Sequence, residues 1–374
     1  MASMPVLNQN EIFTTNSNYI LSEEVFGNNI AGTFSELVDM FRVDGGFYGD
    51  QKVYKATDVL KSHPLWQDTN GVVNKAGVAR EAGNLLATDF PDDPAVQTIV
   101  INVFRQIRLS VQPYLEKRSF MNEGSYTDFN SIMLGWIRET KRVYDSTTFN
   151  SFVGTASSTK GLQNMTITLS TVADDAEKQN RLQAQELAQA VADLIINLKD
   201  CTRDYNDYGY LRSYNIDDLV FVWSSQYVNK LNKLQTPTIF NREGLVDTLG
   251  KYTLPSRYFG DINTAGGTVP ASNTTIRSLI ETDYTVSGTV HHVFAGDLLP
   301  AQATYEANTT YTVNPNIAFK VFHKRSLPYA SNFEMETEFV NPRAHIQTHY
   351  LSFSRNTLAY LKNFPCITAK VDTE

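Results

Sequence analysis

Cysteine is scarce in this chain, and no long apolar run occurs. Its 374 residues include only Cys201 and Cys366, which form no C-x-x-C pair. Two isolated thiols exclude a disulfide framework and suit a reducing compartment. No apolar run of about 18 residues is present, and the N-terminus lacks the basic and apolar regions of a secretory leader. The sequence therefore predicts a soluble protein without a membrane partner.

Basic residues are also in deficit. Lysine and arginine number 32 against 40 acidic residues, which gives a net charge of −8 and a pI near 5.4. Proteins that read nucleic acid need a cationic surface to neutralise phosphates. Sequence-specific recognition of nucleic acid is therefore not expected, whereas contact without sequence specificity stays open.

Motifs for nucleotide binding and hydrolysis are missing. The stretch GTASSTKG, Gly154 to Gly161, has its lysine before the second glycine, so the order required of a phosphate-binding loop is not met. His345 and His349 have the helical spacing of metal ligands, but they lie in a strand-like context without a third ligand nearby. The sequence predicts no catalytic, cofactor-binding or metal site, and hence no cofactor and no enzyme.

The most regular stretch that is present is VQTIVINVFRQIRLSV, Val96 to Val111. Its odd positions are mainly apolar and its even positions mainly polar, and this period of two predicts a half-buried strand. The alternating part, Ile99 to Val111, would span roughly 43 Å, about twice the usual length. Such a strand either crosses the molecule or projects from it.

A second strand-like segment, Phe47 to Leu60, precedes a polar stretch from His63 to Pro94 that glycines and prolines punctuate. With the return strand these segments predict one two-armed excursion with a long irregular tip. An isolated two-stranded ribbon is marginal in water. The apolar face of the return strand must therefore be covered, either by this chain or by another subunit.

Helical patterns follow the excursion. The segment EGSYTDFNSIMLGWIRETKRVYD predicts a long amphipathic helix, which a Gly/Ser/Thr loop ends. A short helix is predicted at Phe34 to Phe41 and a second long one from about Glu177 to Lys199. The apolar run Leu219 to Trp223 predicts a fully buried strand followed by a helix. These elements favour an α+β protein.

Near the C-terminus, NFEMETEF alternates between an apolar set and an acidic row. The acidic row consists of Glu334, Glu336 and Glu338. A cation site or an acid/base cluster is one interpretation, but the solvated face of an edge strand is favoured, since like charges discourage uncontrolled pairing. We also hypothesise that the row meets basic groups of a neighbouring subunit, such as Arg105, Arg108 or Lys324.

The order of these parts resembles the Hong Kong-ninety-seven-type major capsid fold of tailed phages. Among those proteins it looks most like the major head proteins of short-tailed phi-twenty-nine and picovirus-like phages. The resemblance is carried by YGDQKVYKATDVL and IVINVFRQIRLSV as the arms of an E-loop, by SYTDFNSIMLGWIRETKRVYDSTTFNSFVG as the spine-helix region, and by NPRAHIQTHYLSFSRNTLAY near the end.

The resemblance implies a division of the chain into five parts. They are an N-terminal arm (1–33), a short helix with the E-loop (34–112), a peripheral domain with the spine helix (113–175), an axial domain with the second long helix (176–340), and C-terminal strands returning to the peripheral domain (341–374). Relatives that carry their own scaffolding segment begin with a charged helix, which the polar arm does not match.

The resemblance further implies a structural protein that self-assembles as hexamers and pentamers into an icosahedral head. The head would enclose double-stranded DNA, contacted without sequence specificity, and would use a portal and a separate scaffolding protein. The protein would lie in the virion, and in the host cytoplasm during assembly.

The residues expected at subunit interfaces lie on the excursion and in the acidic row. They are Tyr48, Lys52, Tyr54, Ile99, Ile101, Val103, Arg105, Ile107, Arg108, Glu334, Glu336 and Glu338. Some relatives crosslink subunits through a lysine of the E-loop, but nothing singles out one of Lys52, Lys55, Lys61 and Lys75.

Two other classes stay open. A phage tail or surface adhesin protein would share the Thr- and Tyr-rich β character, although the long helices and the lack of internal repeats disfavour it. A carbohydrate-active enzyme needs only two suitably spaced carboxylates, and separation in space is invisible in a sequence.

Overall fold

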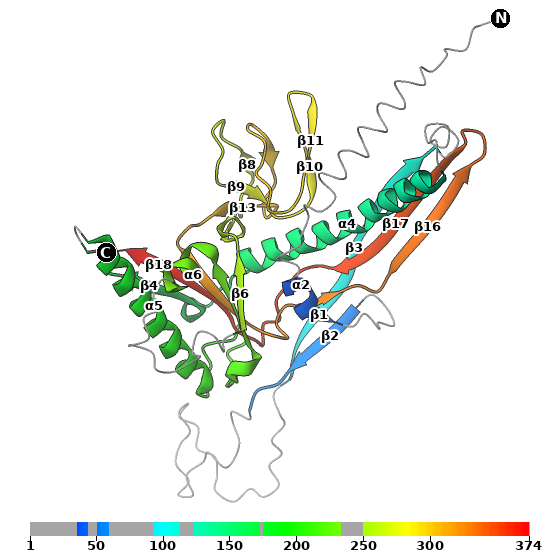
Figure 1. Cartoon of the computed structure of the whole chain (residues 1–374). Helices are drawn as coiled ribbons and strands as arrows, with labels where there is room; N and C mark the ends of the chain where they lie inside the picture. The colour runs from blue at the N-terminus through cyan, green and yellow to red at the C-terminus, as the bar shows by residue number, and fades with distance from the viewer. Residues whose placement is uncertain are drawn as a thin grey trace, which may run out of the picture.

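The computed structural model of the chain describes residues 36–43, 51–59, 93–112, 123–172, 175–232 and 250–373. Figure 1 shows an α/β body and, projecting from it, a long arm made of one helix and a sheet. A small β lobe lies beside the body (Figure 1). The α+β class predicted from the sequence is confirmed.

A mixed five-stranded sheet forms the body. Its order is β4 (Asn164–Leu169), β18 (Cys366–Thr373), β14 (Ile317–His323), β5 (Leu219–Ser224) and β6 (Gly250–Leu254). The central strand β14 is antiparallel to both of its neighbours, β18 and β5, whereas β4 runs parallel to β18 and β6 parallel to β5. Every residue of β5 is buried, as its continuous apolar run predicts.

Helices cover both faces of this sheet. Helix α5 (Ala176–Lys199) packs Leu187, Val191 and Leu194 against one face, in a cluster with Phe221 and Phe319. The Asp175 side chain caps its first turn by accepting a hydrogen bond from the backbone N–H of Lys178. The second long helix predicted from the sequence is thereby confirmed.

The opposite face of the body sheet contacts α2 (Glu36–Phe41) and the end of α4 (Glu123–Thr155). Phe41, Phe149 and Val153 pack there against Val222 and Phe322. A shorter helix, α6 (Ser225–Asn232), follows β5. Short 3₁₀ turns lie at Gly161–Gln163 (η2), Ile216–Asp218 (η3) and Ser256–Tyr258 (η4).

Helix α4 is longer than the sequence predicts, because the Ser/Thr-rich stretch expected to be a loop continues the helix to Thr155. Thr147 and Thr155 donate their hydroxyl hydrogen bonds to the carbonyls of Val143 and Ser151, one turn earlier. The hydroxyls thus find partners on the helix itself, and burial of the apolar residues between them stabilises the extension.

The small β lobe contains short strands only. They are β7 (Gly260–Ile262), β8 (Gly267–Thr268), β9 (Ile276–Ser278), β10 (Thr282–Val286), β11 (Thr289–Val293), β12 (Thr304–Tyr305) and β13 (Thr310–Val313). The lobe has its own core of Val269, Tyr284, Val293, Leu299 and Ala303. Gly296 has a φ of 84°, and a Cβ there would lie 2.6 Å from the Tyr258 ring, so this contact between lobe and body requires glycine.

The arm contains a four-stranded antiparallel sheet in the order β16 (Glu334–Asn341), β17 (Ile346–Asn356), β3 (Ala95–Val111) and β2 (Gln51–Ala56). The 17-residue strand β3 confirms the long strand predicted from its alternation. A two-stranded parallel pair, β1 (Arg42–Val43) with β15 (Tyr329–Ala330), lies where the arm meets the body.

The five-part division expected from the resemblance stays a prediction, although strand pairing crosses its boundaries. Strand β16, which lies within residues 176–340 except for Asn341, pairs with β17 in the arm, and β18 falls within 341–374 but pairs with β14 in the body. Strand pairing depends on contacts between distant segments, so a linear division of the chain cannot express it.

The two halves of the excursion, which contain β2 and β3, are both held where they meet the body, and we call this place the root. Asp58, just after β2, accepts hydrogen bonds from the Arg203 guanidinium at 2.5 Å and from the Leu211 N–H at 2.9 Å. On the returning arm, the Gln97 amide donates to the carbonyl of Tyr360 and accepts from the N–H of Lys362, each at 2.9 Å. The root therefore fixes where both arms leave the body.

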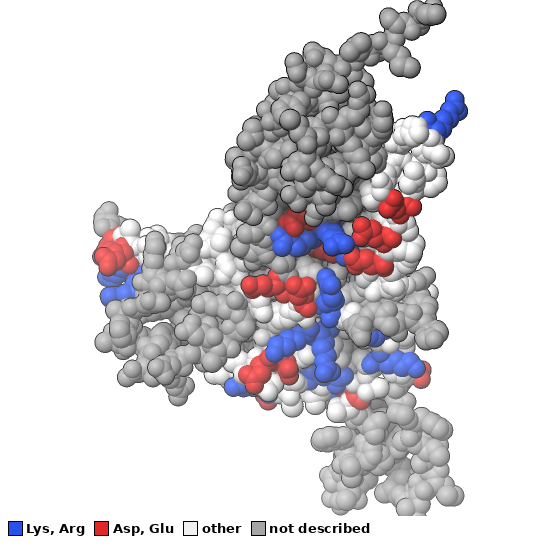
Figure 2. All heavy atoms as spheres, turned by 45° about the vertical axis from the view of Figure 1, so that its right-hand side comes forward, with Lys and Arg blue, Asp and Glu red and all other residues white. Residues whose placement is uncertain are grey.

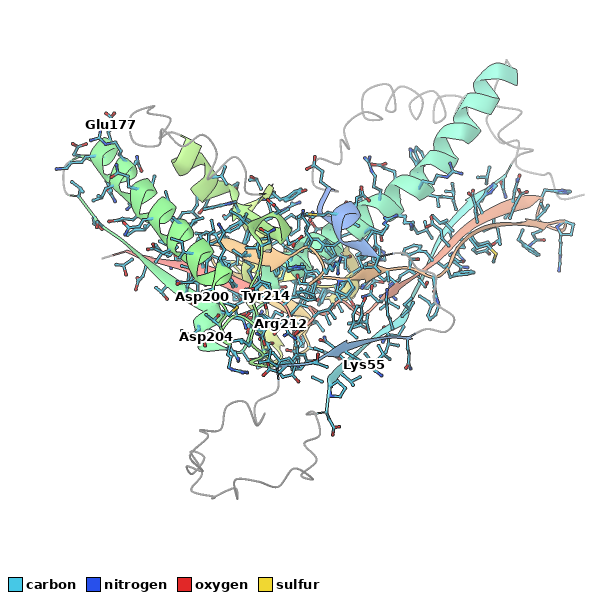
Figure 3. All side chains as sticks on the ribbon, turned by 90° about the horizontal axis from the view of Figure 1, so that it is seen from below. Lys55, Glu177, Asp200, Asp204, Arg212 and Tyr214 are labelled. Atoms are coloured by element: carbon cyan, nitrogen blue, oxygen red, sulfur yellow. The ribbon has the colours of Figure 1, made fainter. Side chains whose placement is uncertain are left out.

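The segment from Thr202 to Arg212 that receives the root is itself ordered. Thr202 and Arg212 form an antiparallel bridge, and buried Asn206 bonds to both backbone groups of Tyr210. Figure 3 labels Arg212 between helix α5 and the blue strand β2. The Arg212 guanidinium also donates to the carbonyl of Thr57 at 2.5 Å. This segment is one of the attachments of the excursion to the body, and the contacts of Gln97 with Tyr360 and Lys362 are another.

Opposing effects set the pKa of the Asp58 carboxyl at the root. Burial acts to raise the pKa of the Asp58 carboxyl, but the hydrogen bonds from Arg203 and from the Leu211 backbone outweigh it and hold this pKa at about 2. An ordinary aspartate in an unfolded chain has a pKa near ~3.9. The contribution of Asp58 to stability is therefore present above that pH and is lost as the pH falls through about 2.

Replacing Leu187 by Ala should lower the free energy of unfolding by about 2–5 kcal/mol, because it opens a cavity in the body core. Urea denaturation measures this change. The matched control is Ile196→Ala on the same helix: Ile196 is 65% exposed, so the free energy should change by less than about 0.5 kcal/mol. Equal effects of the two substitutions would contradict the position of α5.

Asp58→Asn should remove the acid sensitivity of the root. In the unchanged chain, hydrogen-exchange protection factors of the β2 amides should fall between about pH 4 and 2 as Asp58 protonates. The substituted amide side chain lacks the charge, so protection should already be lower at neutral pH and change less with pH. Asp93→Asn, an exposed position before β3, is the control. An unaltered pH profile in the Asp58 variant would refute this account.

Candidate assembly interface

The two faces of the arm sheet differ in what covers them. Directly paired residues of neighbouring strands lie on the same face. Ile107 of β3 pairs with Leu351 of β17, which pairs with Glu336 of β16, and these three face helix α4. Phe104 lies on the other face, which we call the open face.

Helix α4 covers the inner face of the arm sheet. Its Ile137 and Tyr144 pack against Leu351 and Phe353, with Ile107 and Leu109 of β3 at the margin. The Tyr144 and Phe353 rings meet edge to face, with centroids 5.5 Å apart. Part of the apolar side of β3 is therefore covered by the chain's own helix.

The acidic row also faces α4. The Glu334 carboxylate lies 2.8 Å from Lys141 Nζ, and the Glu336 carboxylate lies 3.3 Å from the Arg138 guanidinium. Glu338 accepts a hydrogen bond from the Gln347 amide at 2.5 Å. The edge strand β16 is thus held to the helix by charge, and the hypothesis of a contact with a neighbour's Arg105, Arg108 or Lys324 stays a prediction.

Lys141 connects three elements of the arm. Besides Glu334 it lies 3.6 Å from the Asp145 carboxylate, and its ammonium sits 5.5 Å from the centre of the Phe353 ring. Asp145 accepts a hydrogen bond from the Tyr329 hydroxyl at 2.5 Å. Burial raises the pKa of Asp145, although Tyr329 and Lys141 act to lower it. Lys141 and Asp145 together thus join α4 to β15, β16 and β17.

The open face of the arm sheet carries large exposed apolar side chains. Phe104 is 58% exposed, Met335 47% and Phe339 60%. Their strand partners on this face are mostly polar, since Met335 pairs with Ser352 and Phe339 with Thr348. Exposed apolar groups on one face of an ordered sheet are typical of a surface that another molecule covers.

The predicted interface residues fall into three environments. Ile99 and Ile101 are buried in the single chain, Val103 and Ile107 are half-buried, and Arg105 and Arg108 are exposed. Lys52 and Tyr54 of β2 line a cavity that lies at the root. Tyr48, Lys61 and Lys75 lie outside the described residues. Because Ile99 and Ile101 are already buried, any contact of β3 with another molecule is made by its exposed and half-buried side chains.

Sequence reasoning missed two parts of this site. Phe104 was passed over because it occupies an even position of an otherwise polar series, and that irregularity was the available signal. Arg138 and Lys141 were missed as partners of the acidic row because no sequence pattern shows which face of β16 meets the helix.

Within the described ranges no group of three His, Cys, Asp or Glu side chains is placed to hold a metal ion. None of the helices described there is long and apolar enough to cross a membrane.

Two solved structures share this architecture. One is the capsid structure of Staphylococcus phage Andhra, with a TM-score of 0.59 and 13% identity over 91% of this chain and 84% of that one. The other is a chain in the structure of the head fiber and inner core protein gp22 of native bacteriophage P68, with a TM-score of 0.58 and 12% identity over 89% and 83%. The predicted Hong Kong-ninety-seven-type fold is confirmed.

No curated protein matches the chain by sequence. A family model described as Phi29-like phage major capsid protein, however, matches residues 56–368. The match runs from the last residue of β2 through the rest of the arm and the body into β18. The resemblance predicted from the order of the sequence elements is therefore confirmed, and the chain belongs to the Phi29-like phage major capsid protein family.

Proposed function

We propose that this major capsid protein assembles as hexamers and pentamers that close into an icosahedral phage head around double-stranded DNA. The observation that carries the proposal is the pairing of a rigid projecting arm with an open face rich in exposed apolar groups. A chain with this shape can reach a neighbour and present it with a surface that is incompletely covered in isolation.

The arm suits this task because its length and stiffness come from packed structure. Helix α4 has 33 residues and spans roughly 50 Å at ~1.5 Å per residue. Its side-chain contacts with β16 and β17 resist bending of the sheet. Contacts of modest individual strength then add up, because a closed symmetric shell repeats each of them many times.

The interface residues named from the sequence are part of this proposal. Arg105 and Arg108 are exposed along β3, and the excursion that starts at β2 would act as the E-loop over an adjacent subunit. The five-part division of the chain is proposed in the same sense. Crosslinking through a lysine of the excursion is not part of this proposal.

The partners follow from the same proposal. A portal and a separate scaffolding protein would take part in assembly in the host cytoplasm, and the finished shell would enclose DNA without reading its sequence. A net charge of −8 is consistent with loose contact. A capsid protein is a structural component of the virion, so the adhesin and carbohydrate-active enzyme alternatives lose their support.

The decisive test of function is electron microscopy with light scattering on the chain, alone and co-expressed with its genomic neighbours. Closed shells or uniform capsomer-sized rings are expected. Persistent monomers or trimers under all these conditions would refute the proposal.

Deletion of residues 63–91 should abolish shells while leaving the subunit folded, and normal particles from that deletion would remove the E-loop assignment.

Phe104→Asp combined with Phe339→Asp should reduce the yield of closed particles at least about tenfold, because charges on the open face would be buried without partners on assembly. The unfolding midpoint of the isolated subunit should change little, since both side chains are exposed. Particle yield is measured by sedimentation. Leu162→Asp, on a 64% exposed residue of the body, is the control and should assemble normally. Equal yields from all three chains would exclude the open face from the interface.

A further inference from the structure

A cavity at the root is basic in an otherwise acidic protein. It has a volume of about 560 Å³ and lies among the end of α2, the strand β2 and the loops before β15 and β18. Its basic lining residues are Arg42, Lys52, Lys55, Lys324 and Arg325, and the described lining contains no aspartate or glutamate. Basic side chains also gather on the lower part of the face shown in Figure 2.

Aromatic and aliphatic groups form most of the rest of the lining, to which Gln97 and Asn363 also belong. Tyr54, Tyr208, Phe364 and Leu361 contribute to it, and the Lys52 ammonium lies 5.7 Å from the centre of the Tyr54 ring. The ion pair of Arg42 with Asp39, at 3.7 Å, is exposed on both sides, so solvent screens it. The cavity therefore fits an anionic ligand with a substantial apolar portion.

The chain itself contains a segment of that chemistry. Residues 1–35 include Glu11, Glu23 and Glu24 and no lysine, arginine or histidine. Within this stretch the sequence YILSEEVF, residues 19–26, places two adjacent glutamates between aromatic and aliphatic residues. The charge and the apolar content of this segment complement those of the cavity. A DNA-binding arm would instead need basic residues.

The same segment is tethered close to the cavity. In the sequence, residues 1–35 are followed directly by α2, which begins at Glu36, and Met40 and Phe41 of α2 line the cavity. The 12 residues from Glu24 to Glu36 can span at most about 40 Å when extended. A tether of this length gives an effective concentration on the order of millimolar, which favours the chain's own arm over a competitor in dilute solution.

We propose that this cavity is the docking site of residues 19–26 of the chain's own N-terminal arm in the unassembled subunit. Glu23 and Glu24 would lie against the lysines and arginines, with the flanking apolar residues against Tyr54 and Phe364. Docking there connects α2, the root of the excursion and the loop that contains Lys324 and Arg325. The proposal concerns the free subunit and does not depend on shell formation.

Hydrogen exchange with mass spectrometry on the full-length, unassembled chain tests this inference at low ionic strength. Amides of residues 19–26 should be protected at least about tenfold relative to a Glu23→Lys/Glu24→Lys chain. Lys324→Glu/Arg325→Glu should cause a similar loss. The chain with all four changes should recover at least half of the protection, because it restores opposite charges. Lys178→Glu/Arg181→Glu, on exposed positions of α5, should leave the protection unchanged.

Several results would overturn the inference. Unprotected amides at residues 19–26 in the unchanged chain would do so, as would protection that both charge reversals leave intact. Protection that rises with chain concentration would show docking on another copy. If the cavity variant lost binding to duplex DNA while arm protection persisted, the cavity would be a phosphate site. If the Lys324→Glu/Arg325→Glu chain fails to fold, the Glu23→Lys/Glu24→Lys chain and a salt titration of the unchanged chain still test whether charge holds residues 19–26 in place.

Discussion

A strand of 17 residues cannot stay ordered in water unless something covers it, and helix α4 meets this need for β3. The helix places Ile137 and Tyr144 over Leu351 and Phe353, and the margin of that cluster includes Ile107 and Leu109 of β3. Without this contact the sheet would be a polar ribbon with little apolar burial to stabilise it. The arm, its open face and its ability to reach another subunit all depend on this one packing interaction.

The second dependence lies at the root. Neither β2 nor β3 enters the body sheet, so both arms are connected to it mainly through side-chain and loop contacts. Asp58 with Arg203 and Gln97 with Lys362 join positions far apart in the chain. These contacts act together with the pairing of β3 and β17, so the arm sheet and the root jointly set the direction in which the excursion leaves the body.

Elements with strong local patterns could be predicted from the sequence. The alternation in β3, the apolar run of β5 and the stripe of α5 each determine an element and its buried side. The orientation of the acidic row could not be predicted, because alternation separates two faces without showing which one meets the helix. The extension of α4 was hidden by its serines and threonines, although Thr147 and Thr155 bond to carbonyls of the helix itself and Phe149 and Val153 are buried against the body.

The root was beyond sequence reasoning for a different reason. Its bonds join residues whose positions become close only after the body and the arm have formed. No local property marks Asp58 or Gln97 as different from other polar residues of the excursion. The order of the parts could be expected from the resemblance, whereas the pairing of β3 with β17 that builds the arm is seen only in the structure.

The place of β18 in the body sheet has a consequence for synthesis of the protein. This strand comprises residues 366–373 and lies between β14 and β4, pairing with both. While a ribosome is still making the chain, β4 has no partner strand and the sheet is divided. A chain that lacks β18 therefore cannot complete its body sheet. Formation of the body thus depends on bringing together strands that are separated by long stretches of sequence.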